Sequence, residues 1–174
     1  MHDDLFLHAE MLAQVDVKKP KQVNLRRAVS STYYGMFHYL VGESCCLLFG
    51  SQHAQAAYRR VLGRAFVHSG MKQACVSFAG GTLKEAVIKG LPRDAVGRYP
   101  IHEAIRRIAR AFAELQDWRN LADYDGNERF KRSEVLPLIE QAKDHVANFS
   151  SLPMSDDKRF FLACLWAWKE LSNR

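Results

Sequence analysis

Hydrophobic residues recur at helical spacing along most of the chain, and no stretch alternates for long in the way a β-strand does. The clearest helix follows Pro100, where apolar positions succeed one another at intervals of four, three, four and three. They are Ile101, Ile105, Ile108, Phe112 and Leu115. Charged residues occupy the opposite side, and Gly126-Asn127 is a stop signal. This pattern predicts an amphipathic helix whose last turns carry Arg119, Asn120 and Tyr124.

The same spacing predicts further helices on both sides of this segment. They cover about Asp4–Val15, Asn24–Phe49, Gln55–Ser69, Ser133–Phe149 and Ser155–Leu171. Met71–Phe78 is interpreted as a continuation of the third helix beyond a kink at Gly70, and Leu83–Lys89 as a short helix. We therefore expect a single all-α domain of about five to six helices over residues 1–174. Its core would span about 4–150, and the aromatic helix 155–171 would pack on it or on a partner chain.

The predicted helix from Asn24 to Phe49 is apolar almost all round, which is typical of a central helix. Its exception is a narrow polar strip of Arg27, Ser31, Tyr34 and His38, spaced to share one face.

Composition is ordinary for a folded protein, with 48% hydrophobic and 25% charged residues in 174. No uncharged apolar run is long enough for a membrane span, and the start lacks a secretory signal. The four cysteines have no C-x-x-C spacing, and the seven histidines show no metal-binding spacing. We expect a cytoplasmic protein with reduced thiols, no metal and no cofactor.

The net charge of +6 is concentrated in one part of the chain. Between Val17 and Lys84, ten basic residues accompany a single acid, Glu43. This asymmetry favours an anionic partner such as nucleic acid, although a solvated basic face would look the same. The candidate contacts within the segment include Lys18, Lys19, Lys21, Arg26 and Arg27.

Arg119 continues the apolar stripe four residues beyond Leu115, where a helix built only for packing would carry an apolar residue. One interpretation is an ion pair with Asp123, one turn later, that closes the helix end. The other is a guanidinium held at a concave surface to bind phosphate, with Asn120 adding neutral hydrogen bonds.

Two segments resemble the HEPN family of small helical nucleotide- and RNA-binding domains. Residues 28–38, from Ala28 through Tyr33-Tyr34 to Met36-Phe37-His38, look like its Y-Y-x-M-F-H signature, and Arg119-x-x-Ala122-Asp123-Tyr124 looks like its R-x-x-A/G-D-Y segment. The resemblance covers about residues 7–149. It implies a HEPN-like bundle with an up-and-down core that acts as a homodimer, with two copies of Arg119 near one axis.

Many HEPN proteins are metal-independent ribonucleases with an arginine, a polar residue and a histidine. These positions correspond to Arg119, Asn120 and Tyr124. Histidine exchanges protons near neutral pH, with an ordinary pKa of about 6.5, whereas tyrosine, at about 10, is a poor base. The substitution therefore favours binding over cleavage. His38 and His68 are the histidines that could replace the missing one.

We therefore expect a homodimeric module that binds RNA or a nucleotide through Arg119 and Asn120, with Arg27, His38 and the basic segment as further contacts. One alternative is a toxin-like endoribonuclease, as in toxin–antitoxin pairs, with Arg119, Asn120 and Tyr124 as its catalytic residues. The other is a protein-interaction module that works beside a nucleotidyltransferase.

Overall fold

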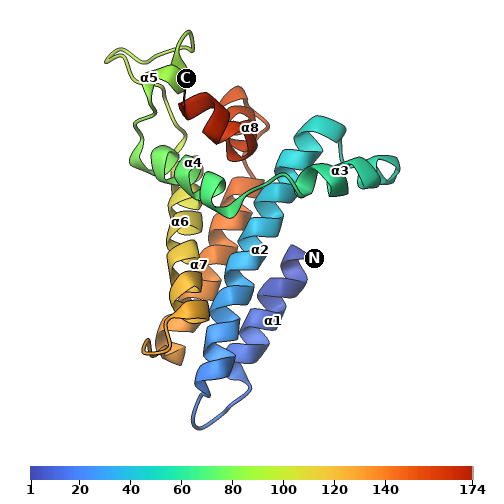
Figure 1. Ribbon diagram of the computed structural model, residues 1–174, viewed down its shortest axis with the longest axis vertical. Coiled ribbons are helices and arrows are strands. Elements are labelled where there is room, and N and C mark those ends of the chain that lie inside the picture. The colour runs from blue at the N-terminus through green and yellow to red at the C-terminus, as the bar shows by residue number, and fades with distance from the viewer. Residues whose placement is uncertain (174) are drawn as a thin grey trace.

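Four long helices lie side by side and alternate in direction (Figure 1). In this computed structural model, which describes residues 1–173, they are α1 (His2–Gln14), α2 (Gln22–Phe49), α6 (Glu103–Tyr124) and α7 (Arg132–Ser150). Helix α2 contacts the other three and also α8 (Asp156–Ser172). The expected all-α fold and the central place of α2 are therefore confirmed for these residues.

A second group of elements covers the upper end of α2, α6 and α7 in Figure 1. It comprises a 3-10 turn (His53–Gln55), α3 (Ala56–Gly63), α4 (His68–Gly80), α5 (Glu85–Ile88) and α8. Residues 1–173 thus form eight α-helices, more than the five to six expected. Helix α3 projects sideways from the bundle, with none of its residues buried.

The extra helices arise mainly because the chain breaks earlier than expected after α3. The break lies at residues 64–67 instead of Gly70, which sits inside α4. Phe66 turns inward and is buried, and Val67 is extended with φ −109° and ψ 125°. Burial of a large aromatic side chain outweighs the modest helical preference of the residues around it.

Helix α8 is part of the main hydrophobic core. Its buried residues in that core are Phe161, Leu162, Cys164, Leu165 and Trp168, while Trp166 remains half exposed. Of the two alternatives for the aromatic helix, packing on its own domain accounts for most of its apolar surface.

Three basic side chains cap helix ends from a distance. Arg26 donates to the carbonyl oxygens of four residues at and just beyond the end of α6: Leu121, Ala122, Asp125 and Glu128. Arg132 donates to three carbonyls at the end of α1, and buried Lys158 to two at the end of α7. Carbonyls at a helix end often lack a partner within their own helix, and a cation there also suits the negative end of the helix dipole. Among those named, the carbonyls of Leu121 and Phe149 also accept from the backbone N–H groups of Asp125 and Leu152.

The cysteines behave as small apolar residues, with one exception. Cys45, Cys75 and Cys164 are free and buried, whereas Cys46 is free and half-buried. Burial raises the pKa of all three buried thiols, that of Cys164 to about 12. The buried thiols are therefore protonated at neutral pH.

Candidate anion-binding site

Arg119 lies on the penultimate turn of α6, with 20% of its side chain exposed. Its Nη2 donates to the hydroxyl of Tyr34 at 3.0 Å, and its guanidinium carbon lies 5.6 Å from the centre of the Tyr34 ring. Tyr34 belongs to the polar strip on α2. The packing of α2 against α6 therefore brings into direct contact the two segments that resemble the HEPN family, residues 28–38 and residues 119–124.

Asp123 forms the ion pair with Arg119 that its spacing predicted, with 2.7 Å between Oδ2 and Nε. The Nε–H does not point along this line, so the contact is an ion pair without a hydrogen bond. Buried Ser30 donates to Oδ1 of the same carboxylate at 2.7 Å, and the Nη1 atom of exposed Arg27 lies 4.0 Å from it. These contacts fix the carboxylate and, through it, one edge of the guanidinium.

The remaining edge of Arg119 is only weakly engaged. Nη1 donates to Oδ1 of Asn120 at 3.3 Å, a long contact to an exposed neighbour. Of the five N–H groups of a guanidinium, one on Nη2 meets Tyr34 and one on Nη1 meets Asn120, while the buried Nε–H has no hydrogen-bond partner. The second N–H of each Nη makes no hydrogen bond to any residue from 1 to 173. Partial burial by itself would lower the pKa of Arg119, but the hydrogen bond with Tyr34 and the charges around it outweigh burial and raise the pKa. The group is a permanent cation.

Tyr124 stands at the surface, with 75% of its area exposed. The Arg119 guanidinium lies over its ring at 5.3 Å, so Tyr34 and Tyr124 both contact the cation. Arg119, Asn120 and Tyr124 therefore form one cluster, in which the Tyr124 ring contacts the charge.

His68, the first residue of α4, reaches this cluster from a third helix. Its Nδ1 lies 2.6 Å from the hydroxyl of Tyr33, and its ring is centred 4.3 Å from that of Phe37 and 6.1 Å from that of Tyr34. Burial lowers the pKa of His68, and the nearby charges of Arg119 and His38 lower it further. His38 lies one turn beyond Tyr34, with 6.5 Å between ring centres, and burial also lowers its pKa.

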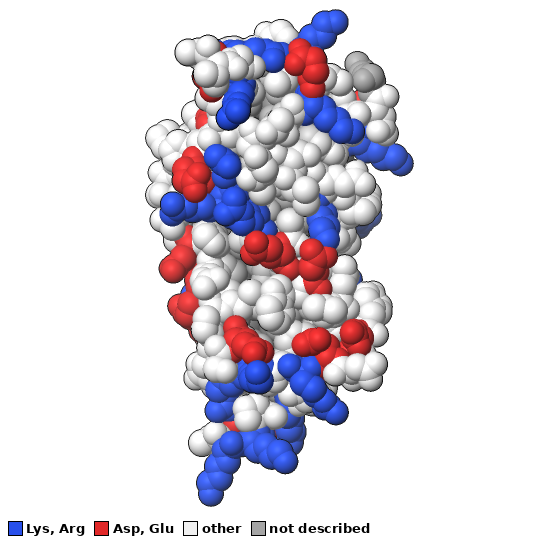
Figure 2. All heavy atoms as spheres, turned by 90° about the vertical axis from the view of Figure 1, so that its left-hand side faces the viewer, with Lys and Arg blue, Asp and Glu red and all other residues white. Residues whose placement is uncertain are grey.

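The basic candidates near the start of α2 separate into two groups. Lys18, Lys19 and Lys21 are exposed in the α1–α2 connection, and Figure 2 shows Lys and Arg side chains gathered at this lower end of the molecule, where α6 also ends (Figure 1). Arg26 is turned inward and donates to carbonyls with both Nη atoms. The structure thus gives Arg26 a capping role in place of the anion contact expected for it.

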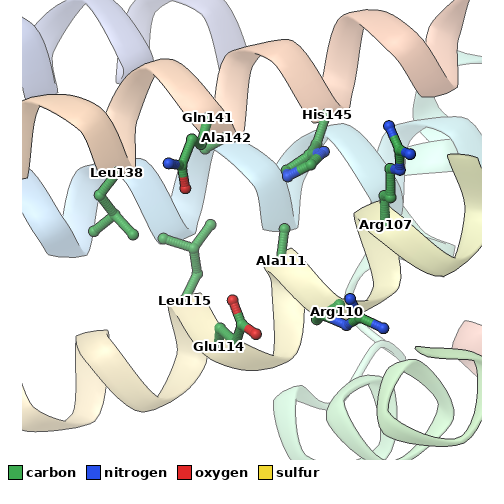
Figure 3. A pocket seen from close by; sticks show the side chains of 9 residues that line it. All are labelled: Arg107, Arg110, Ala111, Glu114, Leu115, Leu138, Gln141, Ala142 and His145. Carbon is green, nitrogen blue, oxygen red and sulfur yellow. The ribbon is translucent and has the colours of Figure 1, made fainter. Parts of the chain in front are cut away.

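A separate hollow of about 310 Å³ lies between α6 and α7 (Figure 3). Gln141 and His145 reach into it from α7, opposite Ala111, Glu114 and Leu115 of α6. Arg107 at its rim is already paired with Glu103, with Nε 3.0 Å from Oε1. None of its lining residues belongs to the Arg119 cluster, and its mixed charges favour no ligand class. We therefore centre the candidate site on Arg119.

Sequence reasoning missed two parts of the cluster. Tyr34 was recognised as a member of the polar strip and of the Y-Y signature but not as a partner of Arg119, and the Ser30–Asp123 contact was not expected. The i, i+4 spacing of the strip was the available signal, but pairing it with Arg119 requires the packing of α2 against α6. His68 reaches the Arg119 cluster because the chain breaks at residues 64–67, after α3. The sequence pattern had placed this break at Gly70.

Comparisons of the chain with protein-family models, with curated proteins and with solved structures found no match. Across residues 1–173, no helix is both long enough and apolar enough to cross a bilayer. Within the same residues, no three His, Cys, Asp or Glu side chains gather closely enough to hold a metal ion.

Proposed function

We propose that this protein is a HEPN-type module that binds RNA, and that Arg119 holds a backbone phosphate. The observation that carries the proposal is the Arg119 guanidinium, which Asp123 and Tyr34 hold in place and which keeps one N–H on each Nη without a partner among the described residues. Such a preorganised fork suits phosphate oxygens, because little conformational entropy is lost when the anion binds.

The charges around Arg119 support the same function. Arg119 and Arg27 carry two positive charges against the one negative charge of Asp123, and the exposed lysines of the α1–α2 connection lie at the same end of the bundle. A polyanion bound at Arg119 could extend toward Lys18, Lys19 and Lys21. These residues would add salt-dependent affinity without reading the sequence.

Titration of a labelled single-stranded RNA at several salt concentrations tests the proposal. We expect Arg119→Met to weaken binding roughly tenfold or more, because it removes a charge-assisted hydrogen bond. The slope of log K against log salt should also fall by about 0.7 for each phosphate that the protein no longer neutralises. Arg107→Met is the matched control, since Arg107 also pairs with an acid four residues away on α6.

A second pair of variants separates a binding role of Arg119 from a structural one. Asp123→Asn removes the competing negative charge but keeps a side-chain oxygen that can accept from Ser30 and hold Arg119 in place, so RNA should bind more tightly than it does to the wild type. Asp117→Asn removes an equal charge from α6 at a residue paired with Lys72, and should have a smaller effect. Equal effects of these two variants, or equal loss of binding in Arg119→Met and Arg107→Met, would rule out the proposed site.

We keep cleavage as the alternative activity and place binding first. No group with an ordinary pKa near neutrality occupies the Tyr124 position, and the exposed Tyr124 ring contacts the Arg119 cation. Incubation with RNA in chelator provides the test, and cleavage that disappears in Arg119→Met would replace binding with catalysis as the function.

The homodimer belongs to the same proposal, because the resemblance implies that two copies of Arg119 share one cleft. Light scattering across a dilution series measures the assembly state, and a monomer that still binds RNA would contradict this part. The nucleotidyltransferase partner remains a prediction.

A further inference from the structure

The imidazole of His68 is held in one orientation by aromatic residues of α2. Its ring lies against Phe37 and at the edge of Tyr34, and its Nδ1 meets the Tyr33 hydroxyl at 2.6 Å. Tyr33 is buried, whereas His68 is exposed at the start of α4. One ring nitrogen is therefore committed to the protein, and the other is directed away from this contact.

The Tyr33 hydroxyl also determines where the imidazole carries its proton. Burial raises the pKa of Tyr33 far above its ordinary value, so the phenol keeps its proton. Among the described residues Nδ1 of His68 is the one hydrogen-bond partner of this hydroxyl. If Nδ1 carried a proton, the phenol hydrogen would have no acceptor, so Tyr33 donates and Nδ1 accepts. A neutral imidazole with Nδ1 unprotonated carries its hydrogen on Nε2.

We infer that His68 is the second ligand of the Arg119 site, and that its neutral Nε2–H donates to the same internal phosphodiester group that Arg119 binds. The inference rests on the proposed function. Its basis is geometric, because Arg119 and His68, which belong to different helices, both contact Tyr34. A neutral Nε2–H cannot accept a proton from a ribose hydroxyl, so in this form His68 binds and does not act as a base.

The net charge of the site also matches an internal phosphodiester group. Two arginines and one aspartate leave a single net positive charge, and a neutral imidazole adds a donor without adding charge. An internal phosphodiester carries one negative charge, whereas a terminal phosphate carries nearly two at neutral pH. The site therefore suits phosphates within a strand, and a 5′-phosphate on the RNA should change the affinity by less than about twofold.

The affinity test uses the full chain with a labelled single-stranded RNA. His68→Ala should weaken binding roughly three- to tenfold, as expected for one neutral hydrogen bond. His68→Gln should recover most of the loss, because an amide also offers an uncharged donor. His53→Ala, at an exposed histidine in the 3-10 turn, is the matched control and should bind like the wild type.

The salt dependence distinguishes a neutral donor from a cation. His68→Ala should leave the slope of log K against log salt unchanged, whereas Arg119→Met lowers it, since only a cation releases counterions from RNA. Nitrogen-15 NMR of the imidazole provides a readout that does not depend on RNA. It should place the hydrogen on Nε2 in the wild type and show mixed forms in Tyr33→Phe.

The outcomes separate this inference from the proposed function. If Arg119→Met weakens binding while His68→Ala does not, the role of His68 is wrong and the function stands. A lower salt slope in His68→Ala, or a hydrogen found on Nδ1, overturns the neutral-donor assignment. Failure of the wild type to bind RNA at low salt removes the proposed function, and the inference with it.

Discussion

At the scale of single residues, Arg26 and Arg27 are adjacent in the sequence and have different surroundings. Arg27 is exposed and approaches Asp123, whereas Arg26 reaches back to α6 and lies over the Phe130 ring at 5.5 Å. A rotation of about 100° per residue is sufficient to turn one side chain outward and the other inward. Composition alone treats both as basic residues, and only the packing of α2 against α6 separates them.

Arg26→Ala should destabilise the fold by about 2–3 kcal/mol, because it removes charged hydrogen bonds and leaves carbonyls at the end of α6 unpaired. Arg26→Lys should recover only part of this loss, since an ammonium lacks the planar fork that spans several acceptors. Urea unfolding measures both. For exposed Arg27→Ala we expect a change within about 0.5 kcal/mol, and a similar cost for both alanine variants would contradict the capping role.

Histidines should make the fold sensitive to mild acid. The pKa values of His38, His68 and His145 are lowered, in each case mainly by burial. Below about pH 6.5 the unfolded chain therefore binds more protons than the native one. The histidine contribution is then present above this pH and is lost as the pH falls through it. Urea midpoints at about pH 7.5, 6 and 5 should decrease in that order, and His38→Asn should flatten the trend.

At the scale of the elements, α1 packs on α2 through a residue without a side chain. A Cβ at Gly35 would lie 3.1 Å from two carbons of the buried Phe6 ring. A Cβ at Gly42, on the same helix, would meet nothing within 4 Å. Close approach at Gly35 therefore allows Phe6 of α1 to enter the core.

Gly35→Ala should be less stable than Gly42→Ala by about 1–3 kcal/mol, the usual cost of overpacking. Both variants gain helix propensity, about 1 kcal/mol relative to glycine, so Gly42→Ala should exceed the wild type in stability. Thermal unfolding of the two variants gives the comparison. Equal stabilities would mean that the Phe6 ring moves aside without cost.

The long helices were predictable from spacing because each buries a continuous stripe, as the positions Ile105, Ile108 and Phe112 illustrate. The ends of the helices were less predictable from the spacing. The second helix was expected to begin at Asn24, yet Asn24 lies inside α2 and donates to Asp16. The helix instead begins after Lys21, whose backbone N–H also donates to Asp16. Contacts between elements decide such ends, and they are not visible in a local pattern.

At the scale of the whole molecule, α8 completes the core. Its buried face includes Trp168, and its Lys158 caps α7. The sequence indicated an aromatic helix but not its docking site, because that surface is formed by α2 and α4 together. The Arg119 cluster likewise needs three helices, so the sequence could place Arg119 and Asp123 but not His68.

Removal of residues 155–174 should abolish cooperative unfolding, since it exposes the apolar faces of α2 and α4 that α8 covers. Thermal melts followed by near-ultraviolet circular dichroism test this. Trp168→Ala should cost about 3–5 kcal/mol, and Trp166→Ala, at a half-exposed residue, should cost less. A truncated chain that still melts cooperatively would show that α8 is an appendage.

The three buried thiols are internal reporters of local opening. Cys45 lies on α2, Cys75 on α4 and Cys164 on α8, and each reacts with a thiol reagent only when its surroundings open. Half-buried Cys46 should react first, and mass spectrometry can time the others separately. If Cys75 and Cys164 become labelled together and before Cys45, then α4 and α8 detach as one unit from an intact four-helix core.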